Sequence, residues 1–170
     1  MMFVDAKRYA GQRASTMHTP RVPIEILLVE DRDDEIQQIE EAVSATDLSN
    51  RVVVARNGYE ALMYLRKVTE QAGRNGGSRQ PEPPGLILLD VNMSQKRGFD
   101  VLHELRTDPR LMTIPVVILT DSLDTTDLAC TLSHGVTGYF LKPMDAQQLE
   151  KVVRDVEEHW SLLMTAPCAN

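Results

Sequence analysis

The sequence predicts an α/β protein with a single doubly wound domain, in which helices cover both faces of a five-stranded parallel sheet. Five short apolar runs recur between residues 24 and 141, and patterns typical of amphipathic helices separate them. Runs that are apolar along their whole length indicate parallel strands buried on both faces. Because a closed barrel of such units needs eight of them, five units favour an open sheet.

The expected strands are leucine-rich or β-branched, as buried strands usually are. In chain order they are IEILLV (24–29), VVVA (52–55), LILL (86–89), VVIL (116–119) and VTGYFL (136–141). Helices are expected where apolar residues recur every three or four positions. The apolar stripes are Ile36, Ile39 and Val43; Ala61, Leu62, Leu65 and Val68; Val101, Leu102 and Leu105; and Leu149, Val152, Val153, Val156, Trp160 and Leu163. One more helix is expected over residues 124–134.

The chain is long enough for one domain with a hydrophobic core, at 170 residues. Residues 1–22 show no clear periodicity, so we expect them to form a flexible N-terminal extension. The domain is expected to span residues 23–164, and residues 165–170 are expected to form a C-terminal tail.

Composition excludes several classes of protein. The formal net charge of −7 argues against general binding to nucleic acids. No apolar run is long enough to span a bilayer, and the N-terminus lacks the apolar core of a signal peptide, so we expect a cytoplasmic protein. Cys130 and Cys168 stand in no metal or redox spacing and are expected to be free thiols.

Polar residues follow the expected strands where each strand ends. Glu30 and Asp31 follow the first strand, Asp90 the third, Thr120 the fourth and Lys142 the fifth. Ligands bind outside the carboxyl ends of the strands in open sheets of this class. Taken singly, such residues have structural explanations, since an acid after a strand often caps the next helix. Their occurrence at the ends of four strands favours a site at this edge.

Three carboxylates held close together repel one another unless a cation compensates for their charge. Mg²⁺ suits such a site, because it prefers oxygen ligands and retains part of its water shell. A carboxylate beside Mg²⁺ is also a plausible nucleophile toward phosphorus, which would give an acyl phosphate. Lys142 and Thr120 supply the charge and the hydroxyl donor that would stabilise the transition state.

Four segments in order resemble the receiver domain of bacterial two-component response regulators: ILLVEDRDDE, LILLDVNMSQKRGFDVL, IPVVILTDS and GYFLKPMD. The resemblance covers roughly residues 23–160. It implies a flavodoxin-like receiver fold with strand order 2-1-3-4-5. The long loop before the third strand and the stretch RTDPRLMTIPVVILT also resemble stand-alone regulators that partner phytochrome-type histidine kinases.

The resemblance implies a role for each residue at the strand ends. Asp90 would accept a phosphoryl group from a kinase histidine, and Mg²⁺ would be held by Glu30, Asp31, Asp90 and the backbone carbonyl of Asn92. Lys142 and Thr120 would contact the phosphoryl group. Lys142–Pro143 would be a cis peptide, and Tyr139 would be the switch aromatic.

The sequence departs from the family pattern at three positions. Glu30 replaces the commoner Asp and remains a possible ligand. Ser94 stands where family members often have Pro, so the loop after Asp90 is expected to be less rigid. Asp121 stands where a small residue is usual, and it would either crowd the phosphoryl group or point to solvent.

The function implied is that of a single-domain response regulator, which is not an enzyme beyond its own phosphorylation and slow dephosphorylation. No output domain is expected, so the signal would pass through a protein surface. The family implies a homodimer through the fourth helix, the fifth strand and the fifth helix, with Trp160 as a candidate anchor. Two alternatives remain open: a receiver-shaped binding module that no longer uses phosphate, and a phosphatase of the haloacid-dehalogenase type.

Overall fold

A computed structural model describes residues 24–45, 51–72, 83–93, 98–121 and 135–165, with side chains described up to Val156. Several sequence-based expectations therefore lie outside the described residues. They are the N-terminal extension, Ser94, both cysteines, the helix over 124–134 and residues 166–170. The backbone of Trp160 is helical, but its side chain is not described.

Strands and helices alternate along the described chain as the sequence predicts. The elements are β1 (Glu25–Val29), α1 (Asp33–Ser44), β2 (Arg51–Ala55), α2 (Gly58–Ala72), β3 (Leu86–Asp90), α3 (Gly98–Thr107), β4 (Val116–Thr120), β5 (Gly138–Leu141) and α5 (Ala146–Thr165). All strand pairs are parallel and the order is β2-β1-β3-β4-β5, which confirms the predicted sheet.

The predicted strand boundaries were wrong by one or two residues in every strand. β1 begins at Glu25 and not at residue 24, and β2 begins at Arg51 and not at residue 52. Asp90 and Thr120 are the last residues of β3 and β4 rather than the first residues after them, because Asp90 pairs with Leu119 and Thr120 with Leu141. The fifth strand begins at Gly138, two residues later than expected, because its pairing with β4 begins between Gly138 and Val117. The two site residues are thus fixed by the sheet itself.

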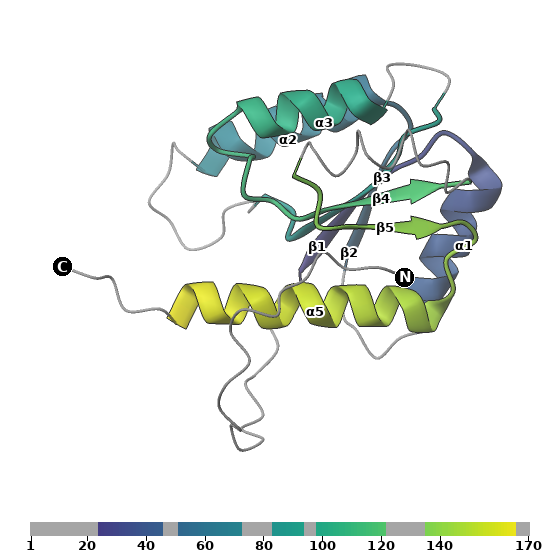
Figure 1. Ribbon diagram of the computed structural model, residues 1–170. Helices are drawn as coiled ribbons and strands as arrows, with labels where there is room; N and C mark the ends of the chain where they lie inside the picture. The colour runs from purple at the N-terminus through teal and green to yellow at the C-terminus, as the bar shows by residue number, and fades with distance from the viewer. Residues whose placement is uncertain (1–23, 46–50, 73–82, 94–97, 122–134, 166–170) are drawn as a thin grey trace.

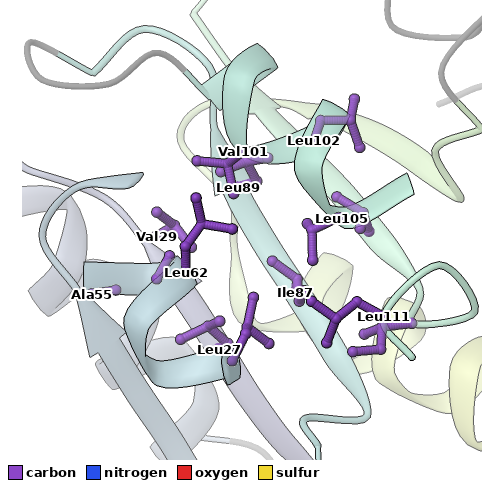
Figure 2. Packing of buried hydrophobic residues seen from close by; sticks show 14 of the residues in the cluster. Leu27, Val29, Ala55, Leu62, Ile87, Leu89, Val101, Leu102, Leu105 and Leu111 are labelled. Atoms are coloured by element: carbon purple, nitrogen blue, oxygen red, sulfur yellow. The ribbon is translucent and has the colours of Figure 1, made fainter. Parts of the chain in front are cut away.

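Alternate residues of the central strands belong to two separate hydrophobic clusters. Helices α2 and α3 cover one face of the sheet, and α1 and α5 cover the other (Figure 1). Leu27, Ile87 and Leu89 pack with α2 and α3, as Figure 2 shows, and Leu28 and Leu88 pack with α1 and α5. Every residue of β3 is buried. This two-sided burial is the reason the strand is apolar along its length up to its final aspartate.

Helix α1 begins directly beyond the first strand end and carries three acids, Asp33, Asp34 and Glu35, in its first turn. Negative charge there interacts favourably with the positive end of the helix dipole. Its N-cap residue is Arg32, so neither Asp31 nor Asp33 is the capping residue that the structural explanation of these acids requires. The acids after β1 are therefore not accounted for by capping.

Helix α5 is the longest described helix, with 20 residues. Leu149, Val152, Val153 and Val156 lie in the cluster shared with α1, while Lys151 and Asp155 are exposed. Among the residues that the structure describes, no helix combines the length and the apolar character required to cross a bilayer.

Gly98 starts α3 against the backbone that follows β3. A Cβ atom on this residue would lie 2.3 Å from the carbonyl oxygen of Asp90 and 2.6 Å from the Cα of Val91. Both distances are far below ordinary contact, and both neighbours are backbone atoms that cannot rotate aside. The absence of a side chain at position 98 therefore lets α3 approach the segment that carries Asp90.

We predict that Gly98→Ala destabilises the protein by about 1–3 kcal/mol, the usual cost of forcing extra atoms into packed structure. Urea unfolding followed by circular dichroism measures the change. His103→Ala, at an exposed position of the same helix, should shift the free energy of unfolding by no more than about 0.5 kcal/mol. A Gly98→Ala variant as stable as the His103→Ala control would contradict the close approach described here.

Candidate functional site

The carboxyl ends of four neighbouring strands bring the predicted residues to one edge of the sheet. Glu30 and Asp31 directly follow β1, Asp90 ends β3, Thr120 ends β4, and Lys142 directly follows β5. The strand order places β1, β3, β4 and β5 side by side. The topology therefore collects residues from positions 30 to 142 of the chain into one site.

Glu30, Asp31 and Asp90 form an acidic cluster. One carboxylate oxygen from each lies within 4.8 Å of the other two, and Glu30 and Asp90 are buried. Burial raises the pKa of Glu30 to about 7, despite the opposing hydrogen bond from Lys142. Burial also raises the pKa of Asp90, while the backbone N–H of Asn92 and the charge of Lys142 act in the opposite direction. Burial thus makes the charged forms of Glu30 and Asp90 unfavourable.

The Lys142 side chain lies at the centre of the site with only 9% of its surface exposed. Its Nζ is 2.7 Å from Oε2 of Glu30 and 3.2 Å from Oδ2 of Asp90, and it also contacts Oε2 of Glu35. Burial lowers the pKa of Lys142, but its hydrogen bonds to Glu30 and Glu35 and nearby carboxylate charge outweigh burial, so its pKa lies above the ordinary lysine value. The lysine is therefore held as a cation among three carboxylates.

Backbone groups orient the charged side chains. The Asn92 N–H donates to Oδ1 of Asp90 at 2.9 Å, and the Arg32 N–H donates to Oε1 of Glu30 at 3.1 Å. The Lys142 N–H donates to the carbonyl of Thr120 at 2.8 Å, which ties the loop after β5 to the end of β4. The Lys142–Pro143 peptide bond is cis. Glu30 and Asp90 are consequently each fixed by the backbone N–H of the residue two positions further along the chain.

The remaining predicted residues lie next to this arrangement. Thr120 is buried at the end of β4, and Tyr139 on β5 is half-buried against the cluster shared with α2 and α3. Asn92 is exposed. Asp121 is also exposed, and with Arg32, Glu35 and Lys142 it lines a cavity of about 310 Å³ whose further lining residues are Asp34, Gln38, Ile39, Leu119, Pro143 and Met144.

Glu35 is a site residue that the sequence analysis did not identify. It is not directly after a strand but in the first turn of α1, and its side chain is 12% exposed. A signal was present, since Glu35 precedes the buried Ile39 by four residues, the spacing that places two side chains on the same side of a helix. Two exposed acids directly before it, Asp33 and Asp34, obscured this signal.

The donor set fits a hard divalent cation. Three carboxylates converge, burial raises the pKa of two of them, and a cation would remove this penalty. Carboxylate oxygens in this number suit Mg²⁺, which keeps several waters when bound. An aspartate at the end of a central strand, flanked by a cation site and a lysine, is equipped for phosphoryl chemistry.

Comparison with known families agrees with this geometry. The family model described as the response regulator receiver domain matches residues 26–154, a span that holds the acidic cluster, Lys142 and Glu35. The chain belongs to this family. Its relatives are response regulators, which are signalling proteins rather than metabolic enzymes.

Individual relatives point to one branch of response regulators. The response regulator Rcp1 from Synechocystis sp. is 33% identical to this chain, over an alignment that covers 86% of this chain and 95% of Rcp1. An Mn²⁺-bound structure of Rcp1 has a TM-score of 0.62 at 31% identity, over 81% of this receiver and 94% of Rcp1.

Two further solved structures are those of phytochrome response regulators. The phosphorylated cyanobacterial protein RcpA is 36% identical with a TM-score of 0.64, over 86% of this receiver and 99% of RcpA. The bacteriophytochrome response regulator AtBRR is 35% identical with a TM-score of 0.63, over 79% of this receiver and 93% of AtBRR. The narrower resemblance to regulators of phytochrome systems is thereby confirmed.

We predict that Mg²⁺ raises the melting temperature of the protein, because a cation that binds only the folded acidic cluster stabilises it. For a chain of this size, about 1 kcal/mol corresponds to a shift of about 2–4 °C. Differential scanning fluorimetry with Mg²⁺ and with EDTA measures the shift. Asp31→Asn should lose it, and Asp34→Asn, which changes a nearby exposed acid outside the cluster, should keep it. Equal shifts in both variants would exclude the cluster as the binding site.

Proposed function

We propose that this chain is a single-domain response regulator that accepts a phosphoryl group from a histidine kinase onto Asp90, and that it signals through a changed protein surface. The observation that carries the proposal is the position of Asp90. It ends the central strand, is buried, and faces Lys142 across 3.2 Å beside two further acids. The domain organisation expected from the sequence and a cytoplasmic location belong to the same proposal.

The chemical step is a displacement at phosphorus. A carboxylate oxygen of Asp90 attacks the phosphorus of a phosphohistidine, the P–N bond breaks, and its electron pair returns to the imidazole nitrogen. The product is an acyl phosphate, which water later hydrolyses to aspartate and inorganic phosphate. The Asn92 N–H holds one oxygen of Asp90 at 2.9 Å and leaves the other beside the lysine.

Charge at the transition state is balanced by groups at the carboxyl ends of the strands. Lys142 neutralises one phosphoryl oxygen, and the Thr120 hydroxyl donates to another. A Mg²⁺ ion held by Glu30, Asp31, Asp90 and the carbonyl of Asn92 would supply the remaining positive charge. The Mn²⁺-bound form of the relative Rcp1 supports a divalent cation in this role.

The surface change would start at Thr120 and pass to Tyr139. Thr120 pairs with Leu141 on the neighbouring strand, two residues beyond Tyr139. A shift of Thr120 toward the phosphoryl group would therefore alter the space beside the half-buried tyrosine. Such a change would shift the population of the protein between two conformations that present different surfaces, and it requires no additional domain.

The kinase partner is proposed from the relatives. RcpA and AtBRR are named as phytochrome response regulators, so a bacteriophytochrome histidine kinase is the partner that this chain fits best. The haloacid-dehalogenase alternative requires a second acid two residues after the nucleophile, where this chain has Asn92. The phosphate-independent binding module remains the competing function, and phosphorylation separates the two.

We predict that the protein gains one phosphate when incubated with Mg²⁺ and acetyl phosphate, and that Asp90→Asn abolishes the gain because no nucleophile remains. Intact-mass spectrometry measures the uptake. Asp100→Asn, which removes an exposed acid in the first turn of α3, should be phosphorylated like the unchanged protein. No uptake from acetyl phosphate or a cognate kinase would favour the binding module, and sustained turnover of small phosphate esters would favour the phosphatase.

The homodimer expected from the family would form on the face of β5 and α5. β5 is an edge strand of the sheet, and Leu141 on it is 45% exposed although it is apolar. Helix α5 extends over 20 residues beside this edge. Burial of Leu141 against a second copy of the chain would remove its side chain from water. Trp160, which lies on α5, remains the proposed anchor.

We predict that Leu141→Glu lowers the dimer fraction of the phosphorylated protein, because it places a charge in the proposed interface. Sedimentation velocity across a concentration series measures the fraction. Met63→Glu, on α2 at 71% exposure, should leave association unchanged and serves as the matched control. A Trp160→Ala variant that dimerises like the unchanged protein would count against this residue as an anchor.

A further inference from the structure

We propose that Glu35 is a positioning residue that holds Lys142 in the unphosphorylated protein, competes with the phosphoryl group for it, and so limits the rate at which Asp90 is phosphorylated. The inference rests on the function proposed above and adds a regulator of that reaction. It concerns a carboxylate outside the acidic cluster and outside the residues that family resemblance supplied.

Three carboxylates surround the ammonium group of Lys142. Nζ forms ion pairs with Glu30, Glu35 and Asp90, and it donates a hydrogen bond to Oε2 of Glu30 at 2.7 Å. The contact with Asp90, at 3.2 Å, is the longest of the three. Before phosphorylation, the lysine is therefore held more closely by the two glutamates than by the phosphoacceptor.

Glu35 differs from the other two partners because it does not belong to the acidic cluster of Glu30, Asp31 and Asp90. A cation bound by that cluster would weaken the hold of Glu30 and Asp90 on the lysine, since it would neutralise them directly. Glu35 would retain its charge. Its place in the first turn of α1 also fixes its backbone on a regular element. Glu35 is thus the partner that continues to draw Lys142 away from the incoming phosphoryl group when the cation is present.

Arg32 gives Glu35 an alternative cation. Its Nη1 lies 2.8 Å from Oε1 of Glu35, the oxygen that does not face Lys142. When Lys142 turns to a phosphoryl oxygen, Glu35 keeps this ion pair and is not left as an unpaired buried charge, which would be strongly unfavourable. The exchange of the lysine between Glu35 and the phosphoryl group is therefore possible without a large penalty.

The test is the rate of phosphorylation by acetyl phosphate in Mg²⁺, followed by intact mass. Glu35→Gln keeps the shape of the side chain and removes its charge, so we expect phosphorylation to accelerate on the order of 3- to 10-fold. Glu35→Asp should restore a rate near that of the unchanged protein. Asp33→Asn removes a charge from the same helical turn, but Asp33 pairs with Arg56 and is not a partner of Lys142, so its rate should not change.

Arg32→Gln should act in the opposite direction, because Glu35 then has Lys142 as its closest cation and holds it more firmly. A double-mutant cycle distinguishes this from a general loss of positive charge. The slowing caused by Arg32→Gln should vanish in the Glu35→Gln background if the arginine acts through Glu35. Slowing of equal size in both backgrounds, or a folded Glu35→Gln variant that is phosphorylated no faster than the unchanged protein, would overturn the proposal.

A measurement independent of phosphorylation separates this inference from the proposed function. The order parameter of the Lys142 ammonium, obtained from ¹⁵N relaxation, should fall in Glu35→Gln and remain unchanged in Asp33→Asn. If the order parameter falls but the unchanged protein takes up no phosphate from any donor, Glu35 holds the lysine and the proposed function is wrong. If the order parameter is the same in all three proteins, the hold itself is refuted.

Discussion

The structure depends on one balance of charge: a single buried ammonium group, that of Lys142, lies among carboxylates that the sheet forces together. Parallel strands direct their carboxyl ends to one edge, so acids that follow β1 and end β3 meet there. Their burial raises the pKa of Glu30 and of Asp90 and makes their charge costly. The lysine after β5 relieves part of that cost, and a cation that fits the remaining oxygens would relieve more.

The rest of the fold holds this balance in place. Two hydrophobic clusters fix β1 and β3 from both faces, so the acids at their ends cannot move apart to reduce repulsion. The lack of a side chain at Gly98 lets α3 approach the backbone of Asp90. The hydrogen bond from Lys142 to the Thr120 carbonyl, at 2.8 Å, fixes the loop that carries the lysine. The reactivity toward phosphorus proposed for Asp90 would therefore follow from packing that prevents the acids from moving apart.

The same balance of charge explains how the phosphorylation rate of a receiver could differ without a change in its reacting residues. Acceptance of a phosphoryl group requires the lysine to change partners, so any acid that binds the lysine affects the reaction. Glu35 and Arg32 form such a pair beside the site. Because both lie at the start of α1, and both line the cavity shared with Asp121, substitutions at this end of the helix offer a route by which related regulators could differ in rate.

The sequence alone determined the fold class and most of the candidate site, because continuous apolar strands imply a parallel sheet and parallel strands imply one common edge for Asp31, Asp90 and Lys142. It determined less about strand ends, where backbone pairing extends β3 and β4 by one residue to include Asp90 and Thr120. Only the tertiary structure placed Glu35 beside the lysine. Lys142 is separated by 112 positions in the chain from Glu30, which follows the first strand, and by more than 100 from Glu35 on the first helix. A contact across that separation depends on the packing of α1 against the sheet, which no local pattern in the sequence specifies.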